Sequence, residues 1–253
     1  MICESDRLRF DNIVRDAVVN GGDMSGIGTL AERSLHLILK RYFGGEGEFA
    51  EVPYMGFVAD VKRGSEITEI QTSTLSGMRD KLSAFFTDCR VRIVWPVAVY
   101  RRIVWINPSS GDVMPSRRAA PRQTPISILP QLVYILDCLT NPSLTLTLVS
   151  LALDEYRVRG GRMSRGRKAD LKLDRVPTEL RGITDIHLPE DAAILMPDAL
   201  PSEFTRAEFS AASGLRGRDL WAALKVLEHL GTICRLPTDG RRVVYRNTSA
   251  RPT

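Results

Sequence analysis

The sequence has few cysteine and histidine residues, and those it has lie far apart. The four cysteines fall in no Cys-x-x-Cys pair, and the three histidines are equally scattered. Because a structural zinc site needs four clustered Cys or His ligands, this spacing argues against such a site. We expect free thiols in a reducing compartment, where disulfides are rare.

Long apolar runs and a secretory leader are lacking as well. No stretch reaches the roughly 18 apolar residues that a membrane-spanning helix needs. The N-terminal segment, residues 1–6, lacks the basic and then apolar order of a signal peptide. We therefore predict a cytoplasmic protein with no membrane partner. The rest of the composition is typical of a globular chain, since 43% of the 253 residues are hydrophobic and 26% are charged.

Positive charge is unevenly distributed along the chain. The net charge is only +5, but basic residues gather between Tyr156 and Gly182, and a smaller cluster lies at residues 117–122. Such stripes suit a polyanion, because each neutralised phosphate releases condensed counterions. Gly160 and Gly161 indicate a solvated, flexible linker instead, and the two interpretations are compatible.

The first 110 residues alternate helical and strand patterns. Thr29–Tyr42 predicts a helix whose Thr29-x-x-Glu32 start has the form of a capping box, and His36 is assigned to its surface or core. The elements predicted after it, two strands, a helix and two strands, are Phe57–Val61, Ile67–Thr72, Leu75–Phe86, Val91–Tyr100 and Arg102–Ile106. Further along, Ser127–Thr140 predicts a helix and Leu144–Arg159 a long strand or strand pair. This order indicates an α/β arrangement.

The hairpin predicted over residues 57–72 brings acidic residues together. A two-residue Gly-Ser loop pairs Val61 with Thr68 and Asp60 with Glu69. Strand alternation then places Asp60, Glu69 and Gln71 on one face. Two opposed carboxylates need a cation between them or a raised pKa, so the pattern predicts Mg²⁺ or Mn²⁺ with oxygen ligands. The alternative is an exposed hairpin whose acids point into water, but apolar residues on both faces of the strand pair argue against it.

The order of helix-borne Glu32, then Asp60, then Glu69-x-Gln71 resembles the PD-(D/E)XK nuclease superfamily, which includes type II restriction enzymes and archaeal Holliday-junction resolvases. The resemblance covers about residues 20–110, and its first helix is similar to that of the resolvase-like branch. It implies a restriction-endonuclease-like mixed sheet flanked by helices. It also implies a metal site that activates water against a DNA phosphodiester, with ligands Asp60, Glu69, the backbone carbonyl of Ile70, and Glu32.

One departure from the superfamily pattern concerns its lysine, which helps position or activate the attacking water. Gln71 stands there instead, and a neutral amide can still orient a water by hydrogen bonds. Lys62 or Lys81 would have to supply the missing cation, and Glu32 has an alternative role as a capping residue. Gln71 thus separates two hypotheses, a metal-dependent DNA endonuclease and a non-catalytic DNA-binding or regulatory protein that keeps an inactive nuclease fold.

Residues 204–247 predict a small winged helix-turn-helix. Thr205-x-x-Glu208 is a capping box, a second helix is expected over Leu215–Leu230, and Asp239-Gly240 is a strong hairpin turn. The second helix of such modules enters the major groove. The candidate DNA contacts are therefore Arg216, Arg218, Lys225, Arg241 and Arg242. A winged helix used for packing against another protein is the alternative.

Together these patterns predict three regions. They are a nuclease-like domain at 1–155, a basic linker at 156–182 and a winged-helix domain at 183–253. DNA is the expected partner, and the chain is also compatible with a homodimer or with a subunit of a larger complex.

Overall fold

The structure is a computed structural model, and it describes residues 2–20, 33–44, 47–119, 123–164, 167–237 and 243–248. Within these ranges the side chains of residues 19, 20, 33, 115–119, 161–164 and 167–169 are not described. The α-helices are α1 (Glu4–Asn20), α2 (Arg33–Tyr42), α3 (Met78–Phe85), α4 (Leu129–Leu132), α5 (Arg206–Ser213) and α6 (Gly217–His229). The 3-10 helices are η2 (Gly47–Phe49), η3 (Pro125–Ile128), η4 (Val133–Cys138) and η5 (Ala192–Leu195).

Strands form one large sheet and one small one. The large sheet has the order β1-β2-β3-β4-β6-β7, with β5 beside β4. Its strands are β1 (Ala50–Tyr54), β2 (Phe57–Arg63), β3 (Glu66–Ile70), β4 (Arg90–Ile106), β5 (Val113–Ala119), β6 (Leu144–Ser164) and β7 (Arg167–Ile186). The small sheet has the order β8-β10-β9, from β8 (Glu203–Thr205), β9 (Ile233–Leu236) and β10 (Val244–Asn247).

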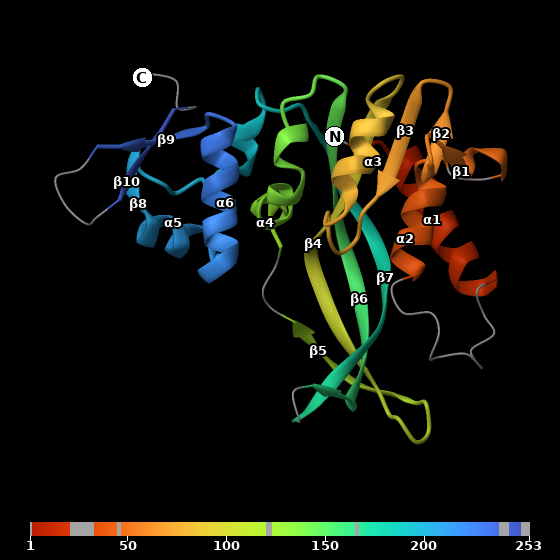
Figure 1. The fold of residues 1–253 in the computed structure, drawn as a ribbon. Helices are drawn as coiled ribbons and strands as arrows, with labels where there is room; N and C mark the ends of the chain where they lie inside the picture. The colour runs from red at the N-terminus through yellow and green to blue at the C-terminus, as the bar shows by residue number, and fades with distance from the viewer. Residues whose placement is uncertain are drawn as a thin grey trace.

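The large sheet is mixed and has helices on both faces (Figure 1). β3, β4 and β6 run parallel, whereas the other neighbouring pairs are antiparallel. On one face, α1 and α2 bury Phe10 and Leu39 against sheet residues such as Ile70. On the other, α3 and the α4 region bury Leu82 and Leu132. The predicted α/β class, with a mixed sheet flanked by helices, is confirmed.

β4 is one strand, although the sequence predicts two. The predicted strands end at Tyr100 and begin again at Arg102, so the predicted break falls at Arg101. In the structure, both arginines reach acids on neighbouring β6, with Arg102 on Asp154 and Arg101 on Glu155. A register shift between Ala98 and Tyr100 lets the strand continue past this point.

The prediction of a linker over residues 156–182 is wrong, because the described residues 156–164 and 167–182 belong to β6 and β7. The two strands pair from Leu146↔Ile186 out to Ser164↔Arg167. Gly160, which the sequence suggests as a flexible point, has a φ of 60° and lies in the register shift between Val158 and Arg162. This glycine therefore marks a bulge inside a ladder.

The helix predicted over Ser127–Thr140 is divided into η3, α4 and η4. Proline occupies an early position of both η3 and α4. Proline at the start of a helical turn cannot donate a backbone hydrogen bond to the preceding turn. Ile135, with φ −123° and ψ 30°, adds a non-helical kink within η4.

The C-terminal region consists of α5, α6 and the small sheet. α5 begins with the predicted capping box, in which Glu208 N donates to Thr205 Oγ1 (3.3 Å) and Thr205 N donates to a Glu208 carboxylate oxygen (2.6 Å). The buried face of α6 packs against α4 and η4 and shares their apolar cluster. The predicted Asp239-Gly240 turn lies outside the described residues. No helix in the described part of the chain is long and apolar enough to cross a membrane.

Candidate functional site

Strands β2 and β3 part where their acidic residues lie. The ladder joins Arg63 to Glu66 and Val61 to Thr68, as the hairpin count predicts, and it extends no further within the described residues. On its other edge β3 pairs with β4 along its whole length. The parting leaves a gap in the sheet between two strands that still lie close together.

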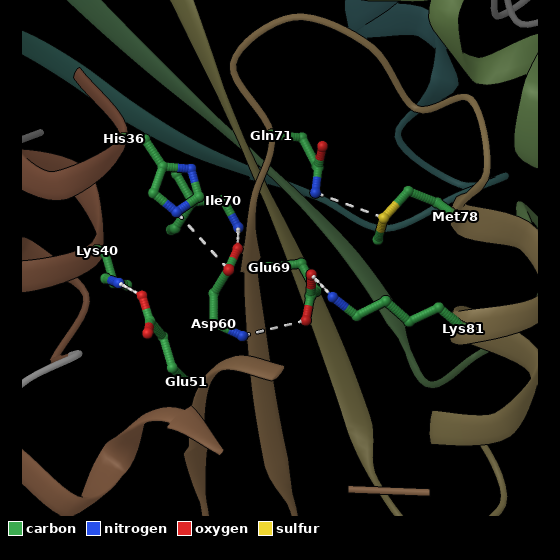
Figure 2. Close-up of polar contacts among 9 residues, drawn as sticks. All are labelled: His36, Lys40, Glu51, Asp60, Glu69, Ile70, Gln71, Met78 and Lys81. Carbon is green, nitrogen blue, oxygen red and sulfur yellow. Dashed lines mark hydrogen bonds and ion pairs between the residues drawn. The ribbon is translucent and has the colours of Figure 1, made fainter. Parts of the chain in front are cut away.

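Asp60 and Glu69 span this gap with hydrogen bonds that replace the missing ladder (Figure 2). Ile70 N donates to Asp60 Oδ2 at 2.7 Å, and Asp60 N donates to Glu69 Oε1 at 3.3 Å. Each carboxylate therefore accepts a backbone hydrogen bond from the opposite strand. The structure thus brings the two predicted acids together.

A lysine from α3 supplies the positive charge that the acid pair requires. Lys81 Nζ donates to Glu69 Oε2 at 2.5 Å, and its side chain is only 16% exposed. Of the two lysines considered from sequence, only this one reaches the acids. Lys62 instead donates to Gly64 O at 2.7 Å and lies over the ring of Tyr54.

Glu69 has the most perturbed carboxyl group of the site. Its side chain is completely buried. Burial, followed by the charge of Asp60, raises the pKa of Glu69 to about 7 from the ordinary value of 4.5, although Lys81 acts in the opposite direction. Two opposed carboxylates were expected to have either a nearby cation or a raised pKa. Here Lys81 supplies the cation, and Glu69 also has a raised pKa.

Three residues of the site were not found by the sequence reasoning. His36 Nε2 lies 3.6 Å from Asp60 Oδ1, and one turn later on α2 Lys40 Nζ lies 2.6 Å from Glu51 Oε1. The hydrogen bond from Lys40 holds the pKa of Glu51 below its ordinary value. The available signal was the i, i+4 spacing of His36 and Lys40, which puts both on one helix face.

These residues line a cleft of about 580 Å³. α2 contributes residues from one side and α3 from the other, with the middle of β2 and the end of β3 between them (Figure 2). The lining residues with ionisable side chains are His36, Lys40, Glu51, Asp60, Glu69 and Lys81. The cleft therefore combines acidic and basic groups at short range.

Gln71 also lines the cleft, but its side chain turns away from the acids. It follows the last residue of β3, and its backbone N donates to Val94 O at 3.0 Å. Its amide Nε2 donates to Met78 Sδ at 3.4 Å (Figure 2). The prediction that Asp60, Glu69 and Gln71 share one face is therefore not borne out. Asp60 lies beside His36 of α2, whereas Glu69 contacts Lys81 of α3, on the opposite face of the sheet. The assignment of Gln71 to orient water stays a prediction.

The donor set suits a hard cation. Asp60, Glu69 and the carbonyl of Ile70 would offer oxygen ligands, which Mg²⁺ prefers and supplements with water. Glu32, the fourth predicted ligand, lies outside the described residues. In the described part of the chain no group of three or more His, Cys, Asp and Glu side chains is placed to hold a metal ion. A cation here would therefore depend on two carboxylates, the carbonyl and water. The donor chemistry fits that arrangement, and the cation would share the Glu69 oxygens with Asp60 N and Lys81 Nζ.

The candidate DNA contacts lie apart from the cleft, on the other side of α4 in Figure 1. Arg216 is the N-cap of α6, and Arg218 and Lys225 are exposed on the helix. Lys225 Nζ is 5.1 Å from the ring centroid of Trp221, which is 50% exposed. Arg241 and Arg242 lie outside the described residues.

The cleft lies within the part of the chain that matches a protein-family model. The family model described as "Domain of unknown function (DUF8091)" matches residues 33–187. The match thus includes α2, α3 and every strand of the large sheet, and it ends before α5. An uncharacterized protein of Treponema pallidum (strain Nichols) is 27% identical over 224 residues, which cover 87% of this chain and 87% of that protein. No solved structure matches the chain significantly. Because the family model covers more than half of the sequence, the chain belongs to the DUF8091 family.

Proposed function

We propose that this protein is a metal-dependent endodeoxyribonuclease that hydrolyses phosphodiester bonds in the cleft. The observation that carries the proposal is the convergence of Asp60, Glu69 and Lys81 from three separate elements. A lysine beside two acids is the set that the superfamily resemblance implies, although here the lysine comes from the following helix. The α/β arrangement of helix, hairpin, helix and strand around these residues also supports the resemblance.

Each residue has a distinct role in this proposal. Asp60 and Glu69 hold Mg²⁺ or Mn²⁺ with the carbonyl of Ile70, and Glu32 contributes directly or through water. The bound ion supplies Lewis-acid chemistry, polarising the phosphate and lowering the pKa of a water. Lys81 offsets the negative charge that develops on the phosphate oxygens, an effect that its low exposure strengthens. Gln71 orients the attacking water.

The C-terminal region is proposed to be a winged helix that binds DNA. Its support is the order α5, α6 and a small antiparallel sheet, with cations at the exposed start of α6. Replacing Arg216 and Arg218 together with Ala should weaken duplex binding and reduce its salt dependence by about one unit of slope per phosphate bound. Unchanged binding in a titration over several salt concentrations would favour a role in packing against another protein. A cytoplasmic location, and a homodimer or larger complex, remain predictions.

The nuclease proposal is tested by cleavage of supercoiled and branched DNA with Mg²⁺ or Mn²⁺. We expect Asp60→Ala and Glu69→Ala to abolish cleavage and Lys81→Ala to reduce it at least about 100-fold, as expected when one electrostatic interaction with the transition state is removed. Lys62→Ala is the matched control, because Lys62 adjoins the site in sequence but bonds to Gly64 O. Equal reductions in Lys62→Ala and Lys81→Ala would contradict the assignment of Lys81.

A second candidate function is that of a DNA-binding or regulatory protein with an inert cleft. The contacts of Glu69 favour it, because Asp60 N and Lys81 already occupy both of its carboxylate oxygens. Gln71 also favours an inert cleft, because its side-chain amide is hydrogen-bonded to Met78. Calorimetry with Mn²⁺ on the wild type and on Asp60→Ala separates the two functions when combined with the cleavage assay. Specific metal binding without cleavage of any DNA form would favour the inert cleft.

A further inference from the structure

The large sheet continues far beyond the cleft as a projecting arm, which we define as residues 101–119, 154–164 and 167–175 (Figure 1). β3 ends at Ile70, which pairs with Val94 of β4. β4 runs on to Ile106, twelve residues further, so at roughly 3.3 Å per residue it reaches about 40 Å beyond the end of β3. Past the pair Ile106↔Val158, β6 remains paired with β7 out to Ser164↔Arg167. The outer end of the arm therefore contains a two-stranded ribbon.

The arm carries more positive charge than the whole chain. It contains eleven Arg and Lys residues against five Asp and Glu residues, a net charge of +6. The complete chain has 35 against 30, a net charge of +5, so everything outside the arm sums to −1. The net positive charge of the chain therefore resides in the arm.

The acids of the arm are concentrated at its base, where they hold the strands together. Asp154 and Glu155 are almost completely buried. Asp154 accepts from Arg102 Nε at 2.8 Å, and Glu155 accepts from Arg157 Nε at 2.6 Å. Further out, residues 159–164 and 167–172 include five Arg or Lys and a single acid, Asp170. The outer arm therefore has a large excess of cations over acids.

Arg159 shows how this outer surface is built. It is exposed, and its guanidinium lies 4.9 Å from the ring centroid of Trp105 on the adjacent strand β4. The aromatic ring supports the cation without neutralising it. Asp170, meanwhile, accepts a backbone hydrogen bond from Gly160 N at 3.3 Å.

The base of the arm adjoins the cleft. Arg175 Nη2 on β7 donates to Thr72 O at 2.8 Å, and Thr72 lines the cleft. Next to it, Asp174 accepts a hydrogen bond from Ser34 of α2, the helix that carries His36. A long anion bound along the arm would therefore lead to the rim of the cleft.

We propose that the arm binds the phosphate backbone of duplex DNA and directs the duplex to the cleft. The choice of DNA as the polyanion rests on the proposed function. A two-stranded ribbon fits the major groove, which is about 12 Å wide. The many Arg and Lys residues suit phosphates, and binding should release condensed counterions as each phosphate is neutralised. In this proposal the arm supplies the sequence-independent affinity of the protein.

The first test measures duplex affinity against salt concentration, using full-length protein and a labelled duplex in EDTA so that no cleavage occurs. The arm variant combines Arg159→Gln, Arg162→Gln and Arg167→Gln. The matched control combines Arg79→Gln, Arg90→Gln and Arg181→Gln, three well-exposed cations outside the arm. We expect the arm variant to bind at least about tenfold more weakly, with the salt slope reduced by about 0.9 for each phosphate that the variant no longer neutralises. The control should keep the wild-type slope.

The second test uses the positions of the three tryptophans, because Trp95 is in the sheet core, Trp105 in the arm and Trp221 on α6. In one variant Trp95→Phe and Trp221→Phe leave Trp105 as the only reporter. In the other, Trp95→Phe and Trp105→Phe leave Trp221. We expect duplex DNA to change the emission of the Trp105 reporter over the same concentration range as binding.

The outcomes separate the arm from the proposed function. Wild-type protein that binds duplex DNA with the same salt slope as the arm variant, and with silent Trp105 emission, overturns the role of the arm and leaves the nuclease proposal standing. Wild-type protein that binds no duplex at any salt concentration overturns both. Circular dichroism of each variant establishes that weaker binding does not reflect unfolding.

Discussion

At the scale of single residues, the unusual group is the carboxyl of Glu69. It is buried beside a second acid, and an isolated buried carboxylate is strongly disfavoured. Two contacts make its charged form tolerable, Lys81 Nζ at 2.5 Å and the backbone N–H of Asp60 at 3.3 Å. These contacts do not fully offset the cost of burying the charge beside Asp60, so the pKa of Glu69 is raised. Perturbed carboxyl groups in a cleft are typical of functional sites, which agrees with the proposed role.

The raised pKa predicts a pH dependence of stability. Between pH 4.5 and about 7 the folded protein keeps a proton on Glu69 that the unfolded chain has released. The stabilising contribution is therefore complete below pH 4.5 and is lost as the pH rises through about 7. We expect the free energy of unfolding of the wild type, relative to Glu69→Gln, to fall by about 2–3 kcal/mol across this window, at about 1.4 kcal/mol per pKa unit. Denaturant unfolding at pH 4.5, 6 and 7.5 measures it, and parallel curves for the two proteins would contradict the assignment.

At the scale of elements, side chains decide where helices and strands begin and end. α5 starts at the reciprocal hydrogen bonds of Thr205 and Glu208. The β2–β3 ladder stops where Asp60 and Glu69 accept the backbone donors themselves. The helical region before β6 is divided where Pro130 starts α4 and where Ile135 leaves helical geometry. In each case the helix or strand begins or ends where the regular hydrogen bonding of the backbone is interrupted.

The capping box gives a prediction at this scale. Thr205→Ala removes the acceptor for Glu208 N, so we expect a decrease of about 1 kcal/mol in the free energy of unfolding. Ser202→Ala is the control, because Ser202 is exposed and its described hydrogen bond, from Asn247 N, goes to its backbone oxygen. Denaturant unfolding of both variants provides the measurement. Equal decreases in stability would show that Thr205 acts through something other than the cap.

At the scale of the whole molecule, the C-terminal region and the large sheet share one apolar core. Leu82 of α3, Leu132 of α4 and Leu227 of α6 belong to the same buried cluster. The small sheet joins it through Phe204 and Tyr245. The arm, in contrast, extends away from the helices (Figure 1). We therefore expect the C-terminal region and the large sheet to unfold together.

The shared core predicts one cooperative transition. Leu227→Ala should lower the free energy of unfolding by about 2–5 kcal/mol, because it opens a cavity at a fully buried position. We expect the buried Trp95 in the sheet and the exposed Trp221 on α6 to report the same shifted midpoint, each followed as the single tryptophan of the chain. A Trp95 midpoint that stays at the wild-type value would show that the C-terminal region unfolds independently.

The sequence by itself determined the local features. The Gly-Ser hairpin and its register, the capping box of α5 and the approach of Asp60 to Glu69 all follow from residues close together in the chain. Such features are predictable because turn geometry and strand alternation act over a few residues.

Only the tertiary structure decided which distant groups meet. The sequence offers both Lys62 and Lys81 and favours Lys81 as the site residue. Only packing of α3 against the sheet brings Lys81 to Glu69, whereas Lys62 bonds to Gly64 O. The same holds for His36, which approaches Asp60 because α2 lies over that part of the sheet. Residues 156–182 have the composition of a linker, yet residues 156–164 and 167–182 form strands, because β6 pairs with β4 and with β7. A strand is stabilised by hydrogen bonds to its neighbours, and its own residues do not reveal whether those neighbours are there.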